Sequence, residues 1–500
     1  MKNLFFSSLF VAVVASACTQ PPAASSSESP NKPPALSSIR EDELREDIFT
    51  LAGDDMRGKR AGTVDELRAA AWVAEQARQA GLKPAGDDGT YFQFFPLRRK
   101  QVAEESKLQV NGQPLTLWED AWVTSPVAGN INNAPVVWLK SLADTTGQDF
   151  TGKVVAMSLQ PPATLPAKGM SLWGYRYILS ALRQQATTLR SQGASAIVLV
   201  SDSMAEANLA FAGHGFEEGT YQLEDAANNQ YGSSTPLILV KQKFASNLQQ
   251  AQAKITAAIN VNSYVYPSIN VVAVAPGTDP ELRDEYVLFS GHHDHDGVGV
   301  PIDGDSIWNG ADDNASVSVA LLAIGRAWTQ SLGKRSALFV WHGAEERGLF
   351  GSRWYAEHPT VEKESIVAVL NGDMIGRNAP DSAALLGAIP PHRNSTNLVN
   401  MAMQANEQLT KFTVDTSWDE ASHPEGWYFR SDHLPYARAG IPAIFFTTLL
   451  HPDYHTPRDE PKGIDISKLA RMTQWMYATG WAVSETAERP DVDPGAKLER

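Results

Sequence analysis

The second half of the chain alternates between short apolar runs and helical patterns, and this alternation restricts the possible folds more than any other feature of the sequence. Strand-like runs occupy residues 271–275, 286–290, 337–341, 366–370 and 441–447. Helical spacing of apolar residues occupies residues 315–329, 344–357 and 464–484. Strands that alternate with helices indicate an α/β domain whose sheet is covered on both faces. We therefore predict a mixed, mostly parallel sheet with helices on both faces.

Residues that can bind a metal ion follow these elements in five places. In sheets of this kind, ligands bind beyond the carboxyl ends of the strands. Each motif alone has an ordinary interpretation as a turn, a helix cap or a charged surface. Their recurrence at successive strand ends instead indicates one site. The candidate metal ligands are His292, Asp312, Glu346, Asp373 and His455.

Two imidazoles and three carboxylates are more ligands than one metal ion needs. A catalytic zinc takes three protein ligands and a water, so five ligands suggest two ions that share a bridging carboxylate. Two ions about 3.5 to 4 Å apart can hold a hydroxide and stabilise the oxyanion that forms when an amide is attacked. We expect two Zn²⁺ ions as cofactors, and Co²⁺ or Mn²⁺ would suit the same ligands.

Two further carboxylates complete the predicted site. Glu345 directly precedes Glu346 and is the candidate general base that takes the proton of the attacking water. In an extended segment Asp294 faces the same side as His292, so its carboxylate can orient that imidazole. We therefore predict catalytic roles for Glu345 and Asp294.

The cysteine count and the net charge exclude other kinds of site. Cys18 is the only cysteine, which excludes intramolecular disulfides and thiolate zinc clusters. The formal net charge is -15, whereas recognition of nucleic-acid phosphates needs a basic surface. We expect no nucleic-acid partner, and any metal must be held by His, Asp and Glu.

The N-terminus is typical of an exported lipoprotein. Residues 1–17 combine a basic start with an apolar run too short to span a membrane, as in a signal peptide. Ala15-Ser16-Ala17-Cys18 resembles the lipobox of bacterial lipoproteins, which would make Cys18 the lipidated first residue. Residues 18–40 are rich in Pro, Ser and Ala and predict a flexible tether. We expect a lipid-anchored protein of the bacterial cell envelope that faces the periplasm, with Thr19 favouring the outer membrane. Ordinary secretion with an incidental cysteine is the alternative.

The motifs around the five candidate ligands resemble one known family. They are residues 291–295 (GHHDH), 309–316 (NGADDNAS), 343–352 (GAEERGLFGS), 371–376 (NGDMIG) and 454–457 (YHTP). In this order they resemble the di-zinc aminopeptidase family, which includes secreted bacterial leucyl aminopeptidases, glutamate carboxypeptidase II and the transferrin receptor. The early segment 57–93 also resembles this family. The resemblance implies a zinc-exopeptidase fold.

The resemblance also implies a role for each candidate ligand. It makes Asp312 the bridging ligand, with His292 and Asp373 completing one metal site and Glu346 and His455 the other. It implies that Glu345 is the general base, that Asp294 orients His292, and that a cis peptide joins Asp312 to Asp313. Val317 departs from the family pattern, in which a Gly is common after Ala-Ser.

The resemblance divides the chain into a discontinuous peptidase domain and an insertion. The peptidase domain is expected at 41–130 and 266–486, followed by a tail at 487–500. Residues 131–265 form short apolar runs with no cluster of metal-binding residues, and resemble a β-rich protease-associated domain. We interpret this insertion as non-catalytic.

The function that follows is a metal-dependent aminopeptidase that removes N-terminal residues from peptides. A hydroxide held by two metal ions would attack the scissile carbonyl, and Glu345 would pass its proton to the leaving amine. A carboxypeptidase or a glutaminyl cyclase could use the same ligands. A non-catalytic binding lipoprotein, with the insertion as its recognition surface, is a third possibility.

Overall fold

A computed structural model describes residues 32–167, 169–224 and 235–499 of the chain. The predicted signal peptide, Cys18 and most of the expected tether lie outside the described residues. Residues 33–500 form one compact unit. Among the described residues, no helix is both long and apolar enough to cross a membrane.

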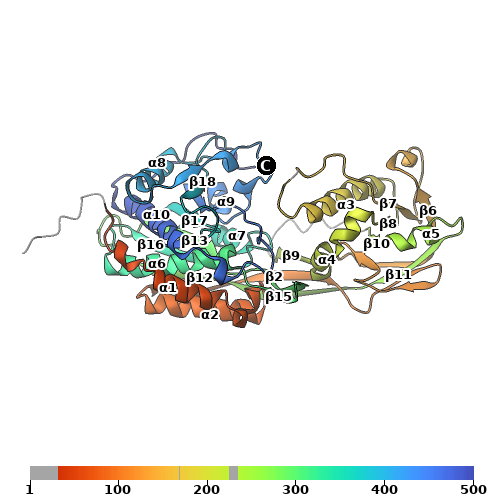
Figure 1. Ribbon diagram of the computed structural model, residues 1–500, viewed down its shortest axis with the longest axis horizontal. Helices are drawn as coiled ribbons and strands as arrows, with labels where there is room; N and C mark the ends of the chain where they lie inside the picture. The colour runs from red at the N-terminus through yellow and green to blue at the C-terminus, as the bar shows by residue number, and fades with distance from the viewer. Residues whose placement is uncertain (1–31, 168, 225–234, 500) are drawn as a thin grey trace, which may run out of the picture. The chain divides into compact units, whose positions relative to one another are not determined.

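The larger of the two main sheets has ten strands in the order β19-β18-β20-β17-β13-β16-β12-β2-β9, with β1 paired to β12 (Figure 1). Its strands are β1 Lys83–Pro84, β2 Phe92–Val102, β9 Thr220–Leu223, β12 Val261–Ala275, β13 Tyr286–His292, β16 Ser336–His342, β17 Ile366–Gly372, β18 Ser382–Leu386, β19 Thr413–Asp415 and β20 Ala443–Thr447. At its centre β13 pairs in parallel with β16 and β17, and β17 with β20.

The expectation of a mostly parallel sheet is wrong. Among the described strands, five of the nine pairings in this sheet are antiparallel. The long antiparallel pair β2–β12 accounts for much of the difference. The sequence indicated only the apolar end of β12, because residues 262, 263, 267, 268 and 270 are Asn, Ser, Pro, Ser and Asn and interrupt the apolar pattern before Val271.

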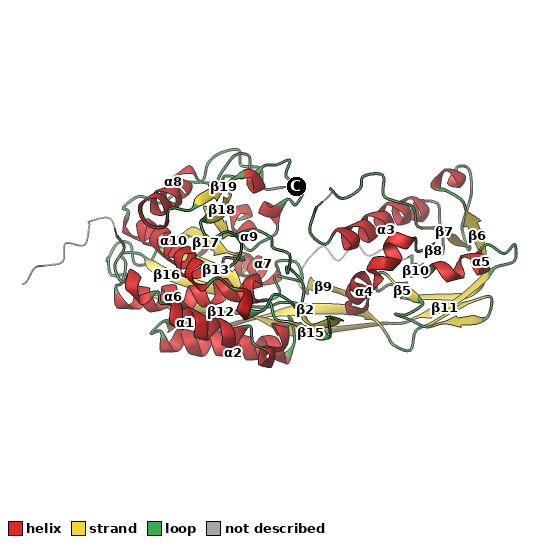
Figure 2. Cartoon of the chain, viewed as in Figure 1, coloured by secondary structure: helices red, strands yellow, loops and turns green. Residues whose placement is uncertain are grey.

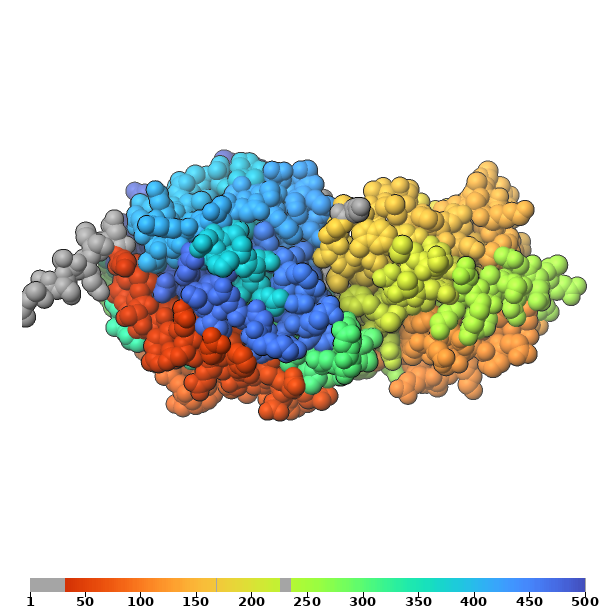
Figure 3. Space-filling view, in the orientation of Figure 1, coloured from red at the N-terminus to blue at the C-terminus, as the bar shows by residue number. Residues whose placement is uncertain are grey.

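Helices cover both faces of this sheet (Figure 2). Its helices are α1 Glu41–Leu51, α2 Val64–Gln79, α6 Ser316–Gln330, α7 Phe350–Glu357, α8 Thr396–Ala405, α9 His433–Arg438 and α10 Ile466–Glu485. The predicted helices at 315–329 and 464–484 are confirmed as α6 and α10. On one face the apolar sides of α1, α2, α6 and α10 pack with Phe289 and Trp341 of the strands, while α7 and α9 pack on the other. Figure 3 shows the N-terminal segment, in red, beside C-terminal segments, in blue, on one face.

The insertion forms a second, eight-stranded sheet in the order β4-β3-β11-β6-β7-β8-β10-β5. Its strands are β3 Lys107–Val110, β4 Gln113–Leu115, β5 Ala121–Val123, β6 Gly129–Leu139, β7 Val154–Ser158, β8 Ala196–Val200, β10 Leu237–Val240 and β11 Lys254–Ile259. Helices α3 Trp173–Ser191 and α4 Ser203–Glu218 pack on one face of it, and α5 spans Ala245–Leu248. The sheet begins at Lys107, earlier than the expected boundary at 131, because β3 to β5 are too short to leave a clear pattern.

Two local expectations are also corrected. The helix expected at 344–357 begins only at Phe350, because Ala344 and Leu349 have φ values of 53° and 58°, in the left-handed region that ends regular helix. The last part of the expected tether is folded rather than flexible. Ile39 is buried, and the Tyr477 hydroxyl donates a hydrogen bond to the Pro34 carbonyl.

A small strand residue on each side makes room for Val317, the position where the chain departs from the family pattern. Val317 is the second residue of α6 and is fully buried. A Cβ at Gly291 in β13 would lie 2.5 Å from Val317 Cγ1, and one at Gly372 in β17 would lie 2.9 Å from the same atom. The valine therefore fits only because both strands carry glycine there.

We expect Gly291→Ala to lower the free energy of unfolding by about 1–3 kcal/mol, because the added methyl overpacks Val317. Urea denaturation of the metal-free protein would measure this loss. Adding Val317→Ala should remove most of the penalty, with a coupling of about 0.5–3 kcal/mol in the double-mutant cycle. Gly215→Ala is the control, because its Cβ would meet only the Tyr175 ring at 3.9 Å. Additive effects of Gly291→Ala and Val317→Ala would contradict the packing.

Candidate active site

The carboxyl ends of the central parallel strands bring together four of the five predicted ligands. His292 is the last residue of β13, and Asp373 follows β17 directly. Glu346 lies in the loop after β16, and His455 lies in the loop after β20. His292 Nε2 lies 3.7 Å from Asp373 Oδ1, and His455 Nε2 lies 3.3 Å from Glu346 Oε2. The parallel order of the strands therefore builds one site from four distant segments.

The fifth position between these groups is taken by Asp313, and the Asp312 assignment is corrected. Asp313 Oδ1 lies 3.2 Å from His292 Nε2, and Asp313 Oδ2 lies 3.2 Å from His455 Nε2. One carboxylate thus faces both imidazoles. The cis peptide is likewise one residue further on than expected, between Asp313 and Asn314.

Asp312 points away from this centre because other groups hold it. Its Oδ1 accepts a 2.7 Å hydrogen bond from the Gly376 backbone N–H, and its Oδ2 lies 3.5 Å from His451 Nε2. The buried Asp459 carboxylate accepts the backbone N–H groups of Asp312 and Asp313 at 3.0–3.1 Å. Burial and the neighbouring Asp459 charge raise the pKa of Asp312 well above its ordinary value.

The electrostatics of Asp313 differ from those of Asp312. Burial alone would raise the pKa of Asp313, but contacts with His292 and His455 hold that pKa well below its ordinary value. The pKa values of the two neighbouring carboxyl groups therefore shift in opposite directions. A carboxylate that faces two imidazoles is placed where it could bridge two metal ions.

The donor atoms suit divalent metal ions. Three groups of possible ligand atoms each lie within 4.8 Å of one another among the described residues. They are His292, Glu345 and Asp373; His292, Asp313 and Glu346; and Asp296, Glu346 and His455. His292 Nε2 is buried and has no hydrogen-bond partner in the described part of the chain. Buried polar atoms without partners are costly, and a metal ion would satisfy this one.

Glu345 and Asp294 lie where the predicted roles would place them. Glu345 Oε2 is 3.8 Å from His292 Nε2, beside the candidate ligands. Asp294 Oδ1 lies 3.7 Å from His292 Nδ1 and accepts the Glu345 backbone N–H at 3.0 Å, and its Oδ2 accepts the Glu346 N–H at 3.4 Å. The backbone carbonyl of Asp294, 3.2 Å from His292 Nδ1, is the hydrogen-bond partner of the imidazole, whereas the Asp294 carboxylate holds the loop after β16. Burial raises the pKa of Glu345 well above its ordinary value, although His292 opposes this.

The sequence reasoning missed two residues that support the ligands. His295 Nδ1 lies 2.8 Å from Glu346 Oε1, and Asp296 Oδ2 lies 3.0 Å from His455 Nδ1. Both belong to the same loop as His292 and Asp294, and the density of His and Asp there was the available signal. Their partners lie 51 and 159 positions further along the chain, so spacing alone did not reveal them.

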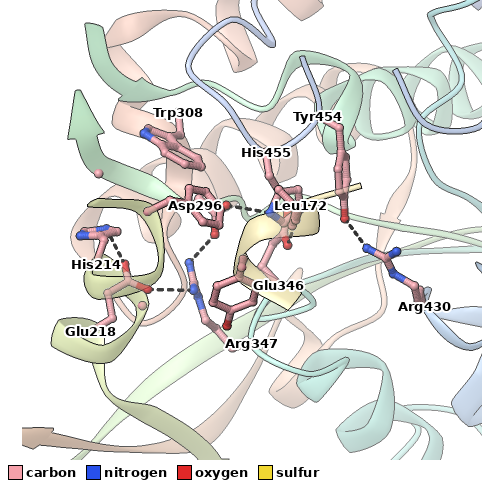
Figure 4. Close-up of a pocket in the computed structure, with 14 residues that line it drawn as sticks. Leu172, His214, Glu218, Asp296, Trp308, Glu346, Arg347, Arg430, Tyr454 and His455 are labelled. Atoms are coloured by element: carbon pink, nitrogen blue, oxygen red, sulfur yellow. Dashed lines mark hydrogen bonds and ion pairs between the residues drawn. The ribbon is translucent and has the colours of Figure 1, made fainter. Parts of the chain in front are cut away.

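A cavity of about 230 Å³ opens beside Glu346 and His455 (Figure 4). Tyr175 and Phe211 of the insertion, with Trp308 of β15, give it aromatic walls. Phe211 stacks on Trp308 at 5.7 Å between ring centroids and meets Tyr175 edge-on at 5.6 Å. β15, Asp305–Trp308, pairs with β14, Gly297–Ile302, in a separate two-stranded sheet. The insertion therefore lines the cavity next to the candidate metal ligands.

The segment that holds all these ligands also matches a known family. Residues 270–480 match peptidase family M28. This match runs from within β12 into α10 and includes His292, Asp313, Glu346, Asp373 and His455. The matched segment therefore supplies every ligand candidate, whereas the insertion lies outside it.

Individual relatives agree with this family. The chain is 28% identical over 243 residues to a probable leucine aminopeptidase of Trichophyton verrucosum, covering 46% of this chain and 60% of that protein. It is 33% identical over 178 residues to leupeptin-inactivating enzyme 1 of Streptomyces exfoliatus, covering 35% of this chain and 34% of that protein. The matches thus span less than two thirds of these relatives. The zinc aminopeptidase BSAP of Bacillus subtilis shares the fold, with a TM-score of 0.58, 18% identity, and 92% and 99% of the two chains covered.

We expect Asp313→Asn to reduce the zinc content of the purified protein, because a neutral amide cannot bridge two cations as a carboxylate does. Asp312→Asn is the matched control, since its amide oxygen can still accept the Gly376 N–H. Metal analysis after dialysis against zinc would compare the two variants. Loss of zinc from Asp312→Asn with full retention in Asp313→Asn would restore the original assignment.

Proposed function

We propose that this protein is a metal-dependent aminopeptidase with a dinuclear site, in which zinc is the expected ion. The observation that carries the proposal is the position of Asp313, whose two oxygens each face one imidazole at 3.2 Å. His292 and Asp373 would complete one metal site, and His455 and Glu346 the other. The match to peptidase family M28 and the aminopeptidases among the relatives support the same reaction.

Each residue has a separate task in this proposal. Bound zinc would polarise the scissile carbonyl and make the attacking water more acidic. Glu345 would take the proton from that water and deliver it to the leaving amine. Its raised pKa suits this exchange, because a carboxyl group that holds a proton readily can carry it between the two steps. Asp294 would keep His292 and the loop that carries Glu345 in place.

The cavity favours an aminopeptidase over a carboxypeptidase. A carboxypeptidase needs a cation to bind the free carboxylate of its substrate, and the cavity wall carries Arg347 and Arg430. Arg347 already pairs with Glu218 and Asp296. The Arg430 guanidinium already donates to Glu425 Oε2 at 3.0 Å and to the Tyr454 hydroxyl at 2.8 Å, and it stacks over Trp427. Its charge is therefore balanced, and the carboxylates around the site suit an α-ammonium group instead.

We expect the zinc-loaded protein to hydrolyse dipeptides whose C-terminus is blocked and to leave N-blocked dipeptides intact. The free amine is the group that the acidic site would recognise, so blocking it should abolish turnover. Amino-acid p-nitroanilides, with and without a chelator, provide the quantitative assay. Cleavage of N-blocked substrates would identify a carboxypeptidase, and cyclisation of N-terminal glutamine would identify a glutaminyl cyclase. No turnover of any of them by the zinc-loaded protein would favour a binding function.

We expect Glu345→Gln to lower kcat by about 10²- to 10⁴-fold, the usual contribution of a general base, with two zinc ions still bound. Glutamine keeps the shape of the side chain but cannot accept the proton. Glu362→Gln, at an exposed position, is the control and should leave kcat unchanged. Full activity of Glu345→Gln would exclude Glu345 as the base.

We further propose that the protein acts at the bacterial cell envelope, anchored through lipidated Cys18 and facing the periplasm, and that the second sheet is a protease-associated domain. The lipobox-like residues before Cys18 support the anchor. The position of the second sheet between β2 and β12 supports an insertion into the peptidase domain.

We expect Cys18→Ala to move the protein from the membrane fraction to the soluble periplasmic fraction, because the lipid attachment point is lost. Fractionation of cells that express each form, followed by immunoblotting, would measure this. A Cys18→Ala protein that stays with the membrane would contradict the lipid anchor.

A further inference from the structure

An ion-pair network at the last residue of α4 joins the insertion to the peptidase domain. Glu218 Oε1 lies 2.7 Å from Arg60 Nη2 and 3.2 Å from His214 Nε2. Glu218 Oε2 lies 3.1 Å from Arg347 Nη1. Glu218 is buried, and Arg347 directly follows the candidate ligand Glu346. The insertion therefore places a buried anion against the loop that supplies a metal ligand.

The network continues from Arg347 to the far side of His455 (Figure 4). Arg347 Nη2 donates a 2.9 Å hydrogen bond to Asp296 Oδ1, and Asp296 Oδ2 lies 3.0 Å from His455 Nδ1. His455 Nε2 faces Asp313 and Glu346 on the opposite edge of the ring. A carboxylate on the second nitrogen of a metal-binding histidine fixes the ring orientation and the tautomer. Asp296 has this position relative to His455.

We propose that Glu218 is a positioning residue of the metal centre, acting through Arg347 and Asp296 on His455. The insertion is then part of the catalytic apparatus rather than an attached module. This inference rests on the proposed dinuclear site, but it concerns how one of its ligands is held, not the reaction.

The charges around Glu218 explain how it can affect the orientation of His455, which it does not contact. Arg60 and Arg347 both contact Glu218, and their side chains are only 15% and 11% exposed. Without this carboxylate, two shielded cations would face each other and Asp296 would be the remaining anion bonded to Arg347. Repulsion between the Arg60 and Arg347 guanidinium groups would then move Arg347 and weaken its hydrogen bond to Asp296. His455 would lose the group that fixes its ring.

Other contacts show that Arg347 has little freedom to compensate. Its guanidinium also lies over the Tyr221 ring, 5.5 Å from the centroid, and β9, which carries Tyr221, follows α4 directly. Burial alone would lower the pKa of Arg347, but Glu218 and Asp296 raise it above its ordinary value. Glu218 and Tyr221 therefore both belong to the chain between β2 and β12, although β9 itself pairs with β2 in the larger sheet.

The test compares Glu218→Gln with Glu217→Gln, which removes the same charge from the neighbouring, exposed residue. Competitive titration with a chromogenic zinc chelator would give the two stepwise zinc affinities of each variant. We expect Glu218→Gln to weaken one zinc ion by about 10- to 100-fold and to leave the other unchanged, because only His455 loses its support. Glu217→Gln should match the unaltered protein. Equal affinities in the two variants, or equal weakening of both ions, would overturn the proposal.

Two further variants separate positioning from general loss of structure. Asp296→Asn should weaken the same zinc ion while leaving the insertion contacts of Glu218 intact, and it carries the test if Glu218→Gln does not fold. Glu218→Asp should recover part of the affinity, since it restores the charge. Thermal unfolding of the metal-free proteins monitors the fold. A protein that binds two zinc ions but cleaves no peptide would contradict the proposed function and leave this inference standing, because zinc affinity is read without turnover.

Discussion

The concentration of buried carboxylates and imidazoles around Asp313 is the interaction on which the site depends. Charged side chains are rarely buried unless they are paired or bind a metal ion. Here His292 and His455 stand on the two sides of one carboxylate, with Glu345, Glu346 and Asp373 close by. Such a cluster is costly to form from side chains alone, and divalent cations would neutralise the excess negative charge. The strands and loops of the larger sheet must therefore hold these carboxylates and imidazoles together.

The strands fix where the ligand-bearing loops begin, and hydrogen bonds within these loops orient the candidate ligands. The parallel strands β13, β16 and β17 end at one edge of the sheet, which fixes where their loops begin. Within the loops, buried carboxylates hold the backbone. Asp294 accepts the N–H groups of Glu345 and Glu346, and Asp459 accepts those of Asp312 and Asp313. Two of the loops that carry candidate ligands are thus held by a carboxylate from another segment.

The insertion changes the environment of this site. Its helices α3 and α4 line the cavity beside Glu346 and His455, and Glu218 holds the arginine next to Glu346. Without the insertion, Trp308 would lose its stacking partner Phe211 and Arg347 would lose its ion pair with Glu218. An insertion that looked non-catalytic because it carries no metal-binding cluster therefore shapes the space that a substrate would occupy.

The sequence by itself indicated the strands β12, β13, β16, β17 and β20, the helices α6 and α10, and four candidate ligands that the structure brings together, because apolar periodicity and chemically distinctive residues are local properties. It did not indicate β14, β15, β18, β19, α8 or α9. It did not separate Asp312 from Asp313. Two adjacent aspartates look alike in the sequence. Which side chain points into the site is decided by hydrogen bonds with Gly376 and Asp459, which lie far along the chain. The link from Glu218 to His455 and the antiparallel half of the sheet also needed the tertiary structure. Ion pairs and strand pairings join segments whose separation in sequence carries no information about their distance in space.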